Sequence, residues 1–392
     1  MMLDEKLNFS TKLIHSSVKT NKPCIAVRAP LYDTTTFSFS DTQSFENAAL
    51  NGDTPFYSRY GNNPNILATE EKLSVLDGTE DALLFSAGMA ALSALFITYG
   101  KNGILCIGNV YGGTQFLLAH QLNSLGIQTN FIPYDQADYL DLFIAKNPGL
   151  IFFESPANPT LDILNIQDIT RLAHENGSLV AMDNTFASAI NQQPIGLGVD
   201  LCMQSATKYL GGHSDLTAGV ITGKKSLLDA IRPWRTNLGQ ICSPATAHLL
   251  DRSLATLPLR INCHNENAMT IAKWLEHHPK ITKVYYPGLP SFSGFETASR
   301  QMKGFGGMIS IDIKGNEKDA IQFINCLKLI TRAASLGGIE SLVSQPARTS
   351  HRNLTPEERN QKGISDTLIR LSIGLENVHD IINDLAQALG QV

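Results

Sequence analysis

A lysine stands directly after a short apolar run in this sequence, where a charged residue is unusual. Lys208 follows the run Leu201–Gln204 within the segment SATKYLGGH, so two hydroxyls precede it and a glycine pair follows it. Burial lowers the pKa of a lysine and frees its amine as a nucleophile, which Schiff-base chemistry requires. Taken alone, the same residues also fit a surface lysine at the start of a helix.

A carboxylate at the end of another apolar run gives this lysine a functional partner. Asp183 follows Leu179–Met182 and precedes Lys208 by 25 residues, one helical crossover in an α/β chain. A carboxylate at the end of an interior strand needs a cation or hydrogen-bond donors, and a protonated pyridine nitrogen would supply one. Pyridoxal phosphate (PLP) requires both a Schiff-base lysine and such a carboxylate. The pair favours this cofactor, with capping of the next turn as the alternative role for Asp183.

Small residues at two strand ends could hold the phosphate of such a cofactor. Gly88 and Met89 lie in SAGMAA, where a strand is expected to become a helix, and the free N–H groups of a helix start suit an anion. Ser205 and Thr207 add hydroxyl donors beside Lys208. A tightly packed strand–helix turn without a ligand would have the same sequence.

Two loops carry aromatic and cationic groups suited to the same ligand. Tyr111, in VYGGT, could stack on a flat ring, and Arg59, in the segment Tyr57-Ser58-Arg59, could make a bidentate contact with phosphate. A merely solvated loop would also contain these residue types.

The runs that precede these residues predict a sheet that is parallel and covered by helices on both faces. Short apolar segments alternate with helical patterns at Thr114–Ser124 and Ile166–Glu175, and such sheets bind ligands at the carboxyl ends of their strands. The expected strands are Ala82–Phe85, Gly103–Ile107, Leu150–Phe153, Leu179–Met182, Leu201–Gln204 and Gly219–Thr222.

The remaining chain predicts a second, smaller α/β unit. A long helix is expected around Arg252–Thr256, followed by a helical stretch at 264–278, strands at Met308–Ile313 and Leu368–Ile373, and a closing helix at Val378–Leu389. We divide the chain into an N-terminal arm (1–55), a large cofactor-binding domain (56–250) and a small C-terminal domain (251–392).

Composition excludes several classes of protein. The 392 residues are 43% hydrophobic and 17% charged, and the formal net charge of −5 offers no electrostatic footprint for nucleic acid. The six cysteines lack CxxC spacing, which predicts buried free thiols in a reducing compartment and no metal site. The polar start is no signal peptide, and the uncharged run Leu83–Tyr99 fits a strand, a glycine turn and a buried helix better than a membrane span. We therefore expect a cytoplasmic protein with no membrane partner.

From about residue 10 to 390, a series of motifs occurs in an order that resembles one known family. The motifs are YSRYGN, SAGMAA, VYGGT, ESPANPT, AMDNTF, QSATKYLGGHSD, SLGGIESL and SDTLIRLSIGLE. The sequence is similar to the Cys/Met-metabolism PLP enzymes, the trans-sulfuration group of cystathionine β- and γ-lyases, cystathionine γ-synthase and methionine γ-lyase. The resemblance implies PLP fold type I, as in aspartate aminotransferase, with a large, mostly parallel seven-stranded sheet. It also implies a homotetramer of two active dimers.

The resemblance also implies roles for individual residues. Lys208 matches the Schiff-base lysine, Asp183 the partner of the pyridine nitrogen and Tyr111 the ring-stacking tyrosine, and these three are the implied catalytic residues. Other cofactor-binding positions are Gly88, Met89, Thr185, Ser205 and Thr207, together with Tyr57 and Arg59 from a neighbouring subunit. Arg370 resembles the arginine that binds the substrate α-carboxylate, with Ser335 and Asn158 nearby.

Several positions depart from the family pattern. The loop YSRYGNNPN carries an extra asparagine, and Arg235-Thr236 and Thr349-Ser350-His351 replace the usual residues at positions expected to touch the substrate mouth. Ala334 precedes Ser-Leu-Gly-Gly where enzymes acting at the γ-carbon of cystathionine usually carry Glu, and Gly113 stands where methionine γ-lyases usually have Cys.

These departures favour β-elimination. The expected activity is a cystathionine β-lyase that converts cystathionine, a small amino-acid substrate, into homocysteine, pyruvate and ammonia. A cystathionine γ-lyase or γ-synthase of the same family is the alternative. An NAD-binding α/β oxidoreductase is a distant one, since no intact glycine fingerprint is present.

Overall fold

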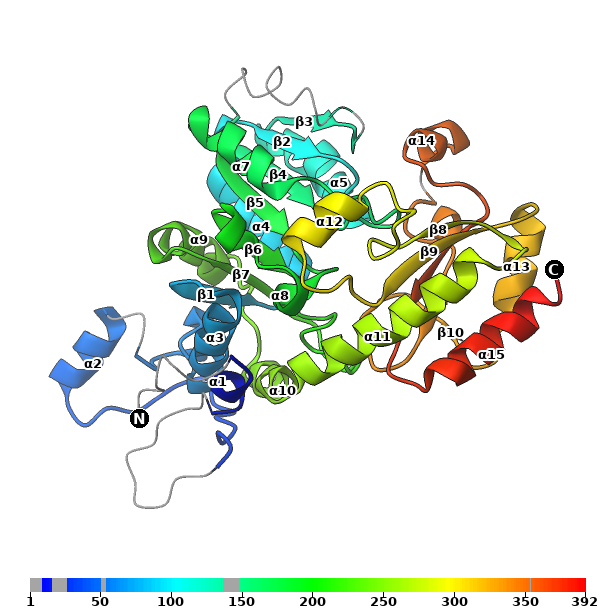
Figure 1. The fold of residues 1–392 in the computed structure, drawn as a ribbon. Coiled ribbons are helices and arrows are strands. Elements are labelled where there is room, and N and C mark those ends of the chain that lie inside the picture. The colour runs from blue at the N-terminus through cyan, green and yellow to red at the C-terminus, as the bar shows by residue number, and fades with distance from the viewer. Residues whose placement is uncertain (1–8, 16–26, 51–53, 135, 137–147, 353) are drawn as a thin grey trace.

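The chain builds two sheets that lie side by side, each with its own helices (Figure 1). The computed structural model describes residues 9–15, 27–50, 54–134, 136, 148–352 and 354–392. The large sheet contains β1 (Asp81–Phe85), β2 (Ile104–Ile107), β3 (Thr129–Ile132), β4 (Leu150–Glu154), β5 (Leu179–Asp183), β6 (Leu201–Gln204) and β7 (Gly219–Gly223). The small sheet contains β8 (Ile281–Tyr285), β9 (Met308–Ile313), β10 (Thr331–Arg332), β11 (Leu342–Ser344) and β12 (Leu368–Ser372).

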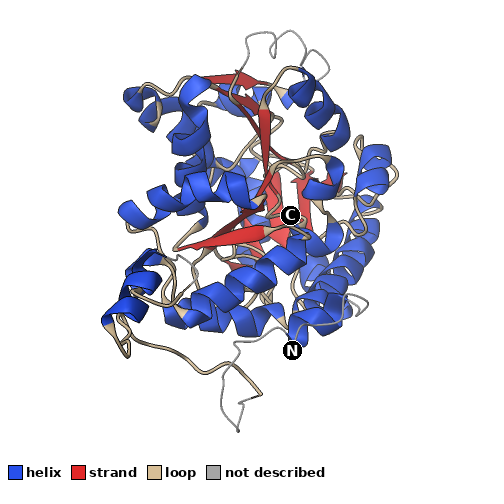
Figure 2. Cartoon of the chain, turned by 90° about the vertical axis from the view of Figure 1, so that its left-hand side faces the viewer, coloured by secondary structure: helices blue, strands red, loops and turns tan. Residues whose placement is uncertain are grey.

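Helices surround both sheets (Figure 2). The α-helices are α1 (Phe9–His15), α2 (Thr42–Leu50), α3 (Pro64–Asp77), α4 (Gly88–Tyr99), α5 (Gly112–Phe116), α7 (Ile166–Glu175), α8 (Ser188–Asn191), α9 (Lys225–Asn237), α10 (Pro244–Leu254), α11 (Leu257–Glu276), α12 (Phe295–Gln301), α13 (Glu317–Cys326), α14 (Pro356–Gln361) and α15 (Val378–Leu389). Short 3₁₀ or π turns are η1 (Ser58–Tyr60), η2 (Gly100–Asn102), η3 (Leu117–Gln121), η4 (Asn123–Leu125), η6 (Pro194–Leu197) and η7 (Pro346–Arg348).

The large sheet has the order β1-β7-β6-β5-β4-β2-β3 and confirms the predicted mostly parallel, seven-stranded α/β architecture. The antiparallel exception is β7, which runs opposite to both of its neighbours, β1 and β6. The segment between β6 and β7 contains no crossover helix, so the chain returns along the sheet in the opposite direction.

Side chains alternate between two apolar layers along the strands of the large sheet. In β4, Leu150 and Phe152 pack with α4 and α9, whereas Ile151 and Phe153 pack with α7 on the other face. Both faces are dry, which explains why these strands read as continuous apolar runs. The uncharged run Leu83–Tyr99 is β1, a glycine turn and the buried helix α4, as predicted.

The small sheet has the order β10-β11-β12-β9-β8, and α11 packs against β8 and β9. The helix expected around residues 252–256 is two helices, α10 and α11, separated at Ala255 and Thr256. Pro258 lies in the first turn of α11, where its missing N–H costs no hydrogen bond, so the sequence favours a new helix start at this place. The stretch expected to be one helix at 114–124 is likewise divided, into α5, η3 and η4.

The loop after Arg59 accommodates the extra asparagine without disruption. Asn62 accepts a hydrogen bond from the backbone N–H of Tyr57 (3.1 Å), and Asn63 caps α3 by accepting from the backbone N–H of Asn65 (2.9 Å). Neighbouring asparagines therefore close the loop and start the helix.

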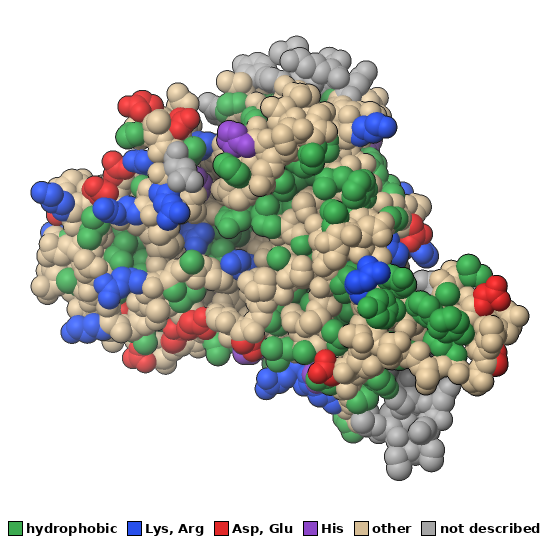
Figure 3. Space-filling view, turned by 180° about the vertical axis from the view of Figure 1, so that it is seen from behind, with side chains coloured by type: hydrophobic (Ala, Val, Ile, Leu, Met, Phe, Trp, Pro, Cys, Tyr) green, Lys and Arg blue, Asp and Glu red, His purple; other side chains and the backbone are tan. Residues whose placement is uncertain are grey.

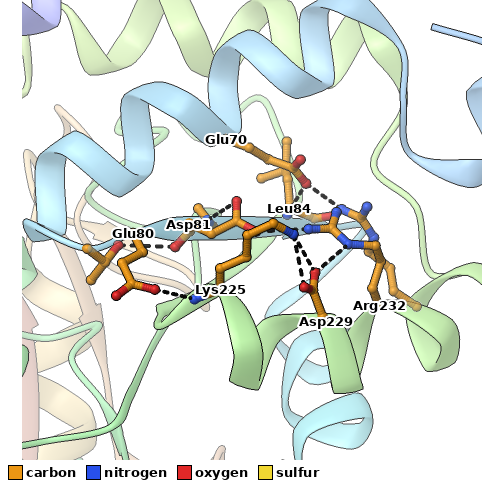
Figure 4. A network of polar contacts seen from close by, with 10 residues as sticks. Glu70, Glu80, Asp81, Leu84, Lys225, Asp229 and Arg232 are labelled. Carbon is orange, nitrogen blue, oxygen red and sulfur yellow. Dashed lines mark hydrogen bonds and ion pairs between the residues drawn. The ribbon is translucent and has the colours of Figure 1, made fainter. Parts of the chain in front are cut away.

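Arg235 does not lie at the substrate mouth, contrary to our expectation. Its side chain is buried, pairs with Glu70 and donates to the backbone oxygen of Leu84 (3.0 Å). Glu70 also accepts from the Leu84 backbone N–H (2.7 Å), so it joins α3 to β1 (Figure 4). At the other end of the network, Arg232 of α9 contacts Asp81 (2.8 Å). Arg235 thus stabilises the packing of α3 and α9 against β1.

No helix in the described ranges is long and apolar enough to cross a membrane. Among the same residues, no group of three or more His, Cys, Asp or Glu side chains could hold a metal ion. Cys106, Cys202 and Cys242 are buried free thiols, but Cys263 and Cys326 are partly exposed, contrary to expectation, and Cys24 lies outside the described residues.

Candidate active site

A cavity of about 1160 Å³ opens between the two sheets. Most of the residues selected from the sequence line it, although they come from distant parts of the chain. They are Gly88, Met89, Tyr111, Asn158, Asp183, Thr185, Ser205, Thr207, Lys208, Ser335 and Arg370.

The direction of the strands explains this convergence. Glu154 ends β4, Asp183 ends β5, and Ser205 follows β6, and these three strands are parallel neighbours. Their carboxyl ends therefore meet at one edge of the sheet, where α/β proteins bind ligands. The small sheet contributes Arg370 from β12 on the opposite side of the cavity.

Lys208 is half-buried and directed into the cavity. Its Nζ donates a hydrogen bond to Oγ of Ser335 (2.9 Å), and its backbone N–H donates to the oxygen of Ser205 (3.1 Å). Burial, with a smaller contribution from the charge of Arg370, lowers the pKa of the amine to about 8. At pH 7 roughly a tenth of Lys208 is therefore the nucleophilic free amine, far more than for a lysine with the usual pKa.

Asp183 lies on the wall of the cavity and is otherwise enclosed by protein. Its Oδ1 accepts a hydrogen bond from the backbone N–H of Thr185 (2.8 Å), and Oγ1 of Thr185 accepts from the N–H of Ser205 (2.8 Å). Desolvation raises the pKa of Asp183 to about 6, against the opposing effect of the Thr185 hydrogen bonds. No cation of the described chain forms an ion pair with this carboxylate, so a positively charged ligand group would be its natural partner.

The amino end of α4 provides a place for an anion. Ala87 at the N-cap has no side-chain oxygen, so the first N–H groups of the helix are left for a ligand. Gly88 faces Ser205 so closely that an added Cβ would lie 3.0 Å from the Cβ of Ser205. Thr207 completes this side, with its hydroxyl bonded to the oxygen and the N–H of Ala218 (both 3.1 Å).

Arg370 is held in a fixed orientation at the other side of the cavity. Its Nη1 donates to Oδ1 of Asn158 (3.0 Å) and its Nη2 to the backbone oxygen of Ser335 (3.1 Å). Ser335 has a φ of 94°, in the left-handed region that a residue with a side chain rarely adopts. This conformation lets one residue contact both Arg370 and Lys208, an example of backbone strain at a site where two side chains must be placed.

Tyr57 and Arg59 do not line the cavity of their own chain. The guanidinium of Arg59 lies 4.7 Å from the centre of the Tyr60 ring and contacts the backbone oxygen of Thr236 (3.4 Å). The structure therefore does not bring this pair together with the other predicted residues within one chain.

Two further residues line the cavity: Glu154, for which no role was predicted, and His351, which was predicted only to lie at the substrate mouth. Glu154 is buried beside Asp183, and its position directly after a predicted strand was a signal that pointed to it. His351 is also buried, and burial lowers its pKa to about 4, so it is neutral at physiological pH. Thr349, Ser350 and His351 all line the cavity, and their place at the substrate mouth stays a prediction.

The residues present fit pyridoxal phosphate. Three features line the same cavity. They are the amine of Lys208 with its lowered pKa, the carboxylate of Asp183, which pairs with no cation of the described residues, and the start of α4 with its free N–H groups. These match the aldehyde, the pyridine nitrogen and the phosphate of the cofactor. A Cβ at position 88 would narrow the space for the phosphate.

Comparisons with known proteins agree with this arrangement. A family model described as Cys/Met metabolism PLP-dependent enzyme matches residues 10–390. An L-methionine gamma-lyase of Pseudomonas deceptionensis is 39% identical, covering 98% of each chain. A cystathionine beta-lyase of Lactococcus lactis subsp. cremoris is 38% identical over 97% of this chain and 99% of its own length.

Solved structures show the same fold. The cystathionine gamma-lyase of Lactobacillus plantarum, complexed with L-serine, has a TM-score of 0.91 and 35% identity, covering 98% of this chain and 99% of its own. The cystathionine gamma synthase of Xanthomonas oryzae pv. oryzae, in complex with aminoacrylate and cysteine, also has a TM-score of 0.91, at 33% identity and 98% coverage of both chains. With the cofactor site described above, these matches show that the chain belongs to the Cys/Met metabolism family of PLP-dependent enzymes, the trans-sulfuration carbon–sulfur lyases that act on sulfur amino acids.

Proposed function

We propose that the protein is a cystathionine β-lyase, which cleaves cystathionine to homocysteine, pyruvate and ammonia. The observation that carries this proposal is Ala334, which lines the cavity beside Ser335 and presents no carboxylate there. The nearby Glu340 does not replace it, because its carboxylate bonds to Ser214 and is not part of the cavity wall.

The side chains supply the steps of a β-elimination. Arg370, already oriented by Asn158, binds the α-carboxylate of the substrate and directs its Cα toward Lys208. Nζ of Lys208 then accepts the proton from Cα, and the thiolate leaves from Cβ. PLP, when bound through Lys208, Asp183 and the start of α4, supplies the electron sink for the Cα carbanion. Tyr111, on the cavity wall, would cover the flat face of the ring.

A γ-elimination would require an additional proton transfer in the same cavity. A second proton must then leave from Cβ. A carboxylate near Ser335 would also accept a charge-assisted hydrogen bond from the end of the substrate that is remote from its α-carboxylate. Ala334 provides no carboxylate, so the cavity favours β-elimination over γ-elimination.

The keto acid formed from cystathionine tests this proposal. We expect the purified enzyme to form mostly pyruvate, and Ala334→Glu to increase the share of 2-oxobutyrate by about 10-fold, roughly the effect of one charge-assisted hydrogen bond. Chromatography of the derivatised keto acids measures both. Ala333→Glu, one residue away and outside the cavity wall, is the matched control. Predominant 2-oxobutyrate from the unmodified enzyme would instead indicate γ-cleavage.

We further propose that the active unit is formed by at least two chains, as in a homotetramer of active dimers. Tyr57 and Arg59 lie outside their own cavity, and the segment around them exposes large apolar side chains (Figure 3). These are Leu31, Phe45, Leu50 and Tyr60, all at least 41% exposed. A second copy would cover them and receive Arg59 at its phosphate.

The oligomer can be tested by native mass spectrometry of the holoenzyme. We expect a mass four times that of the chain, and we expect Arg59→Ala to weaken PLP binding by about 10-fold through loss of a charge-assisted contact. A fully active monomer would contradict the proposal.

A further inference from the structure

Glu154 contacts two segments of the cavity wall, the Tyr111 loop and the Asn158 segment. Its Oε1 accepts a hydrogen bond from the backbone N–H of Tyr111 (2.7 Å), the residue that the proposed function assigns to the cofactor ring. The backbone N–H of Asn158 faces the same carboxyl group, and the side chain of Asn158 holds Arg370. One carboxyl group thus contacts the ring-covering loop and the segment that orients the carboxylate-binding arginine.

The surroundings of Glu154 disfavour a negative charge. Only 5% of the residue is exposed, and it pairs directly with Asp183 on the neighbouring strand. Desolvation first, and the charge of Asp183 second, raise the pKa of Glu154 well above its usual range, although the N–H groups of Tyr111 and Asn158 act in the opposite direction. The buried thiol of Cys106 is a further neighbour, and no cation of the described residues pairs with Glu154.

Two adjoining carboxyl groups in such a place cannot both ionise at low cost. Asp183 is the one that a pyridine nitrogen would neutralise, so the charge belongs on Asp183 and the proton on Glu154. A protonated carboxyl group retains an oxygen that accepts a hydrogen bond, so it can still hold the Tyr111 backbone.

We propose that Glu154 is a positioning residue whose buried carboxyl group holds the Tyr111 loop to the Asn158 segment. It thereby sets the aromatic ring against the cofactor and the Asn158 amide against Arg370. The inference depends on the cofactor and substrate roles of Tyr111 and Arg370 in the proposed function, but not on whether the β- or γ-carbon bond is cleaved.

Two substitutions separate the loss of charge at Glu154 from the loss of its hydrogen-bond acceptor. Glu154→Gln keeps an acceptor oxygen in a side chain of the same shape and resembles the protonated acid. Glu154→Leu keeps the volume but leaves the Tyr111 N–H without a partner, which typically costs about a factor of 10 for a buried donor. We therefore expect Glu154→Gln to stay within about 3-fold of the unmodified enzyme, and Glu154→Leu to lose about 10-fold.

Three measurements report the effect. They are the dissociation constant for PLP from titration of the cofactor-free chain, the visible circular dichroism of bound PLP, and KM separately from kcat. For Glu154→Leu we expect weaker PLP binding, a smaller dichroic band because the ring above the cofactor is misplaced, and a KM that rises more than kcat falls. Glu154→Gln should leave the dichroic band in place.

Asp77→Leu is the matched control for general destabilisation. Asp77 is an equally buried carboxyl group that bonds Gln204 (3.1 Å) and Thr222 (2.7 Å) outside the cavity. The proposal is overturned if Glu154→Gln loses as much as Glu154→Leu, since the charge would then matter, or if Glu154→Leu changes the cofactor measurements no more than Asp77→Leu does. Keto-acid analysis of the unmodified enzyme tests the β-lyase proposal separately. A negative result for that activity can therefore be told apart from a negative result for the role of Glu154.

Discussion

Replacing Lys208 with alanine is expected to lower carbon–sulfur lyase turnover by at least about 10³-fold, because the substitution removes both the cofactor's covalent attachment and the base at Cα. Among the described residues that line the cavity, Lys208 is the only lysine, and its Nζ donates a hydrogen bond to Oγ of Ser335. Initial rates with cystathionine measure the loss. Borohydride reduction followed by peptide mass spectrometry should find the cofactor on residue 208 of the unmodified enzyme and nowhere in the variant.

The lowered pKa of Lys208 gives this prediction a pH dependence. An amine with a pKa of about 8 is increasingly deprotonated as pH rises through that value, so the cofactor-free chain should capture PLP faster at pH 9 than at pH 7. Lys225→Ala is the control, since that lysine is exposed and pairs with Asp229 on α9. Retention of the yellow chromophore and of activity in Lys208→Ala would refute the assignment of the cofactor to this residue.

Arg370→Ala is expected to raise KM for cystathionine by about 100-fold with a smaller effect on kcat. A charge-assisted, bidentate contact with a carboxylate contributes about 1.5–3 kcal/mol, and the buried guanidinium is already oriented by Asn158 and Ser335. Arg370→Lys should recover only part of the affinity, because an ammonium group lacks the planar fork. Steady-state kinetics over a range of substrate concentrations separate the two parameters.

Arg348→Ala provides the matched comparison within the same cavity. Arg348 lines the wall but is exposed and pairs with Glu317 (3.3 Å), so its loss should change KM by less than about 3-fold. Equal effects of the two substitutions, or an unchanged KM in Arg370→Ala, would show that the α-carboxylate binds elsewhere.

Local sequence patterns predicted several of the candidate catalytic residues and the strands that position them. The apolar runs before Asp183 and Ser205 predicted the strands β5 and β6, because a strand buried on both faces requires continuous apolar residues and then a polar end. The parallel arrangement of neighbouring strands then implied that these polar ends meet. The large sheet and most of the cavity wall followed from such local patterns.

Only the tertiary structure decided which distant residues touch. Asn158 and Arg370 are 212 positions apart, and Lys208 and Ser335 are 127 apart, so their contacts depend on how the second sheet packs against the first. The same applies to the reversed direction of β7, the burial of Arg235 against Glu70, and the placement of Arg59 outside its own cavity. Local periodicity reports whether a residue is buried, but its partner and its charge state depend on which groups the fold packs against it. Glu154 is an example, because exclusion of water and then the neighbouring charge of Asp183 raise the pKa of its carboxyl group.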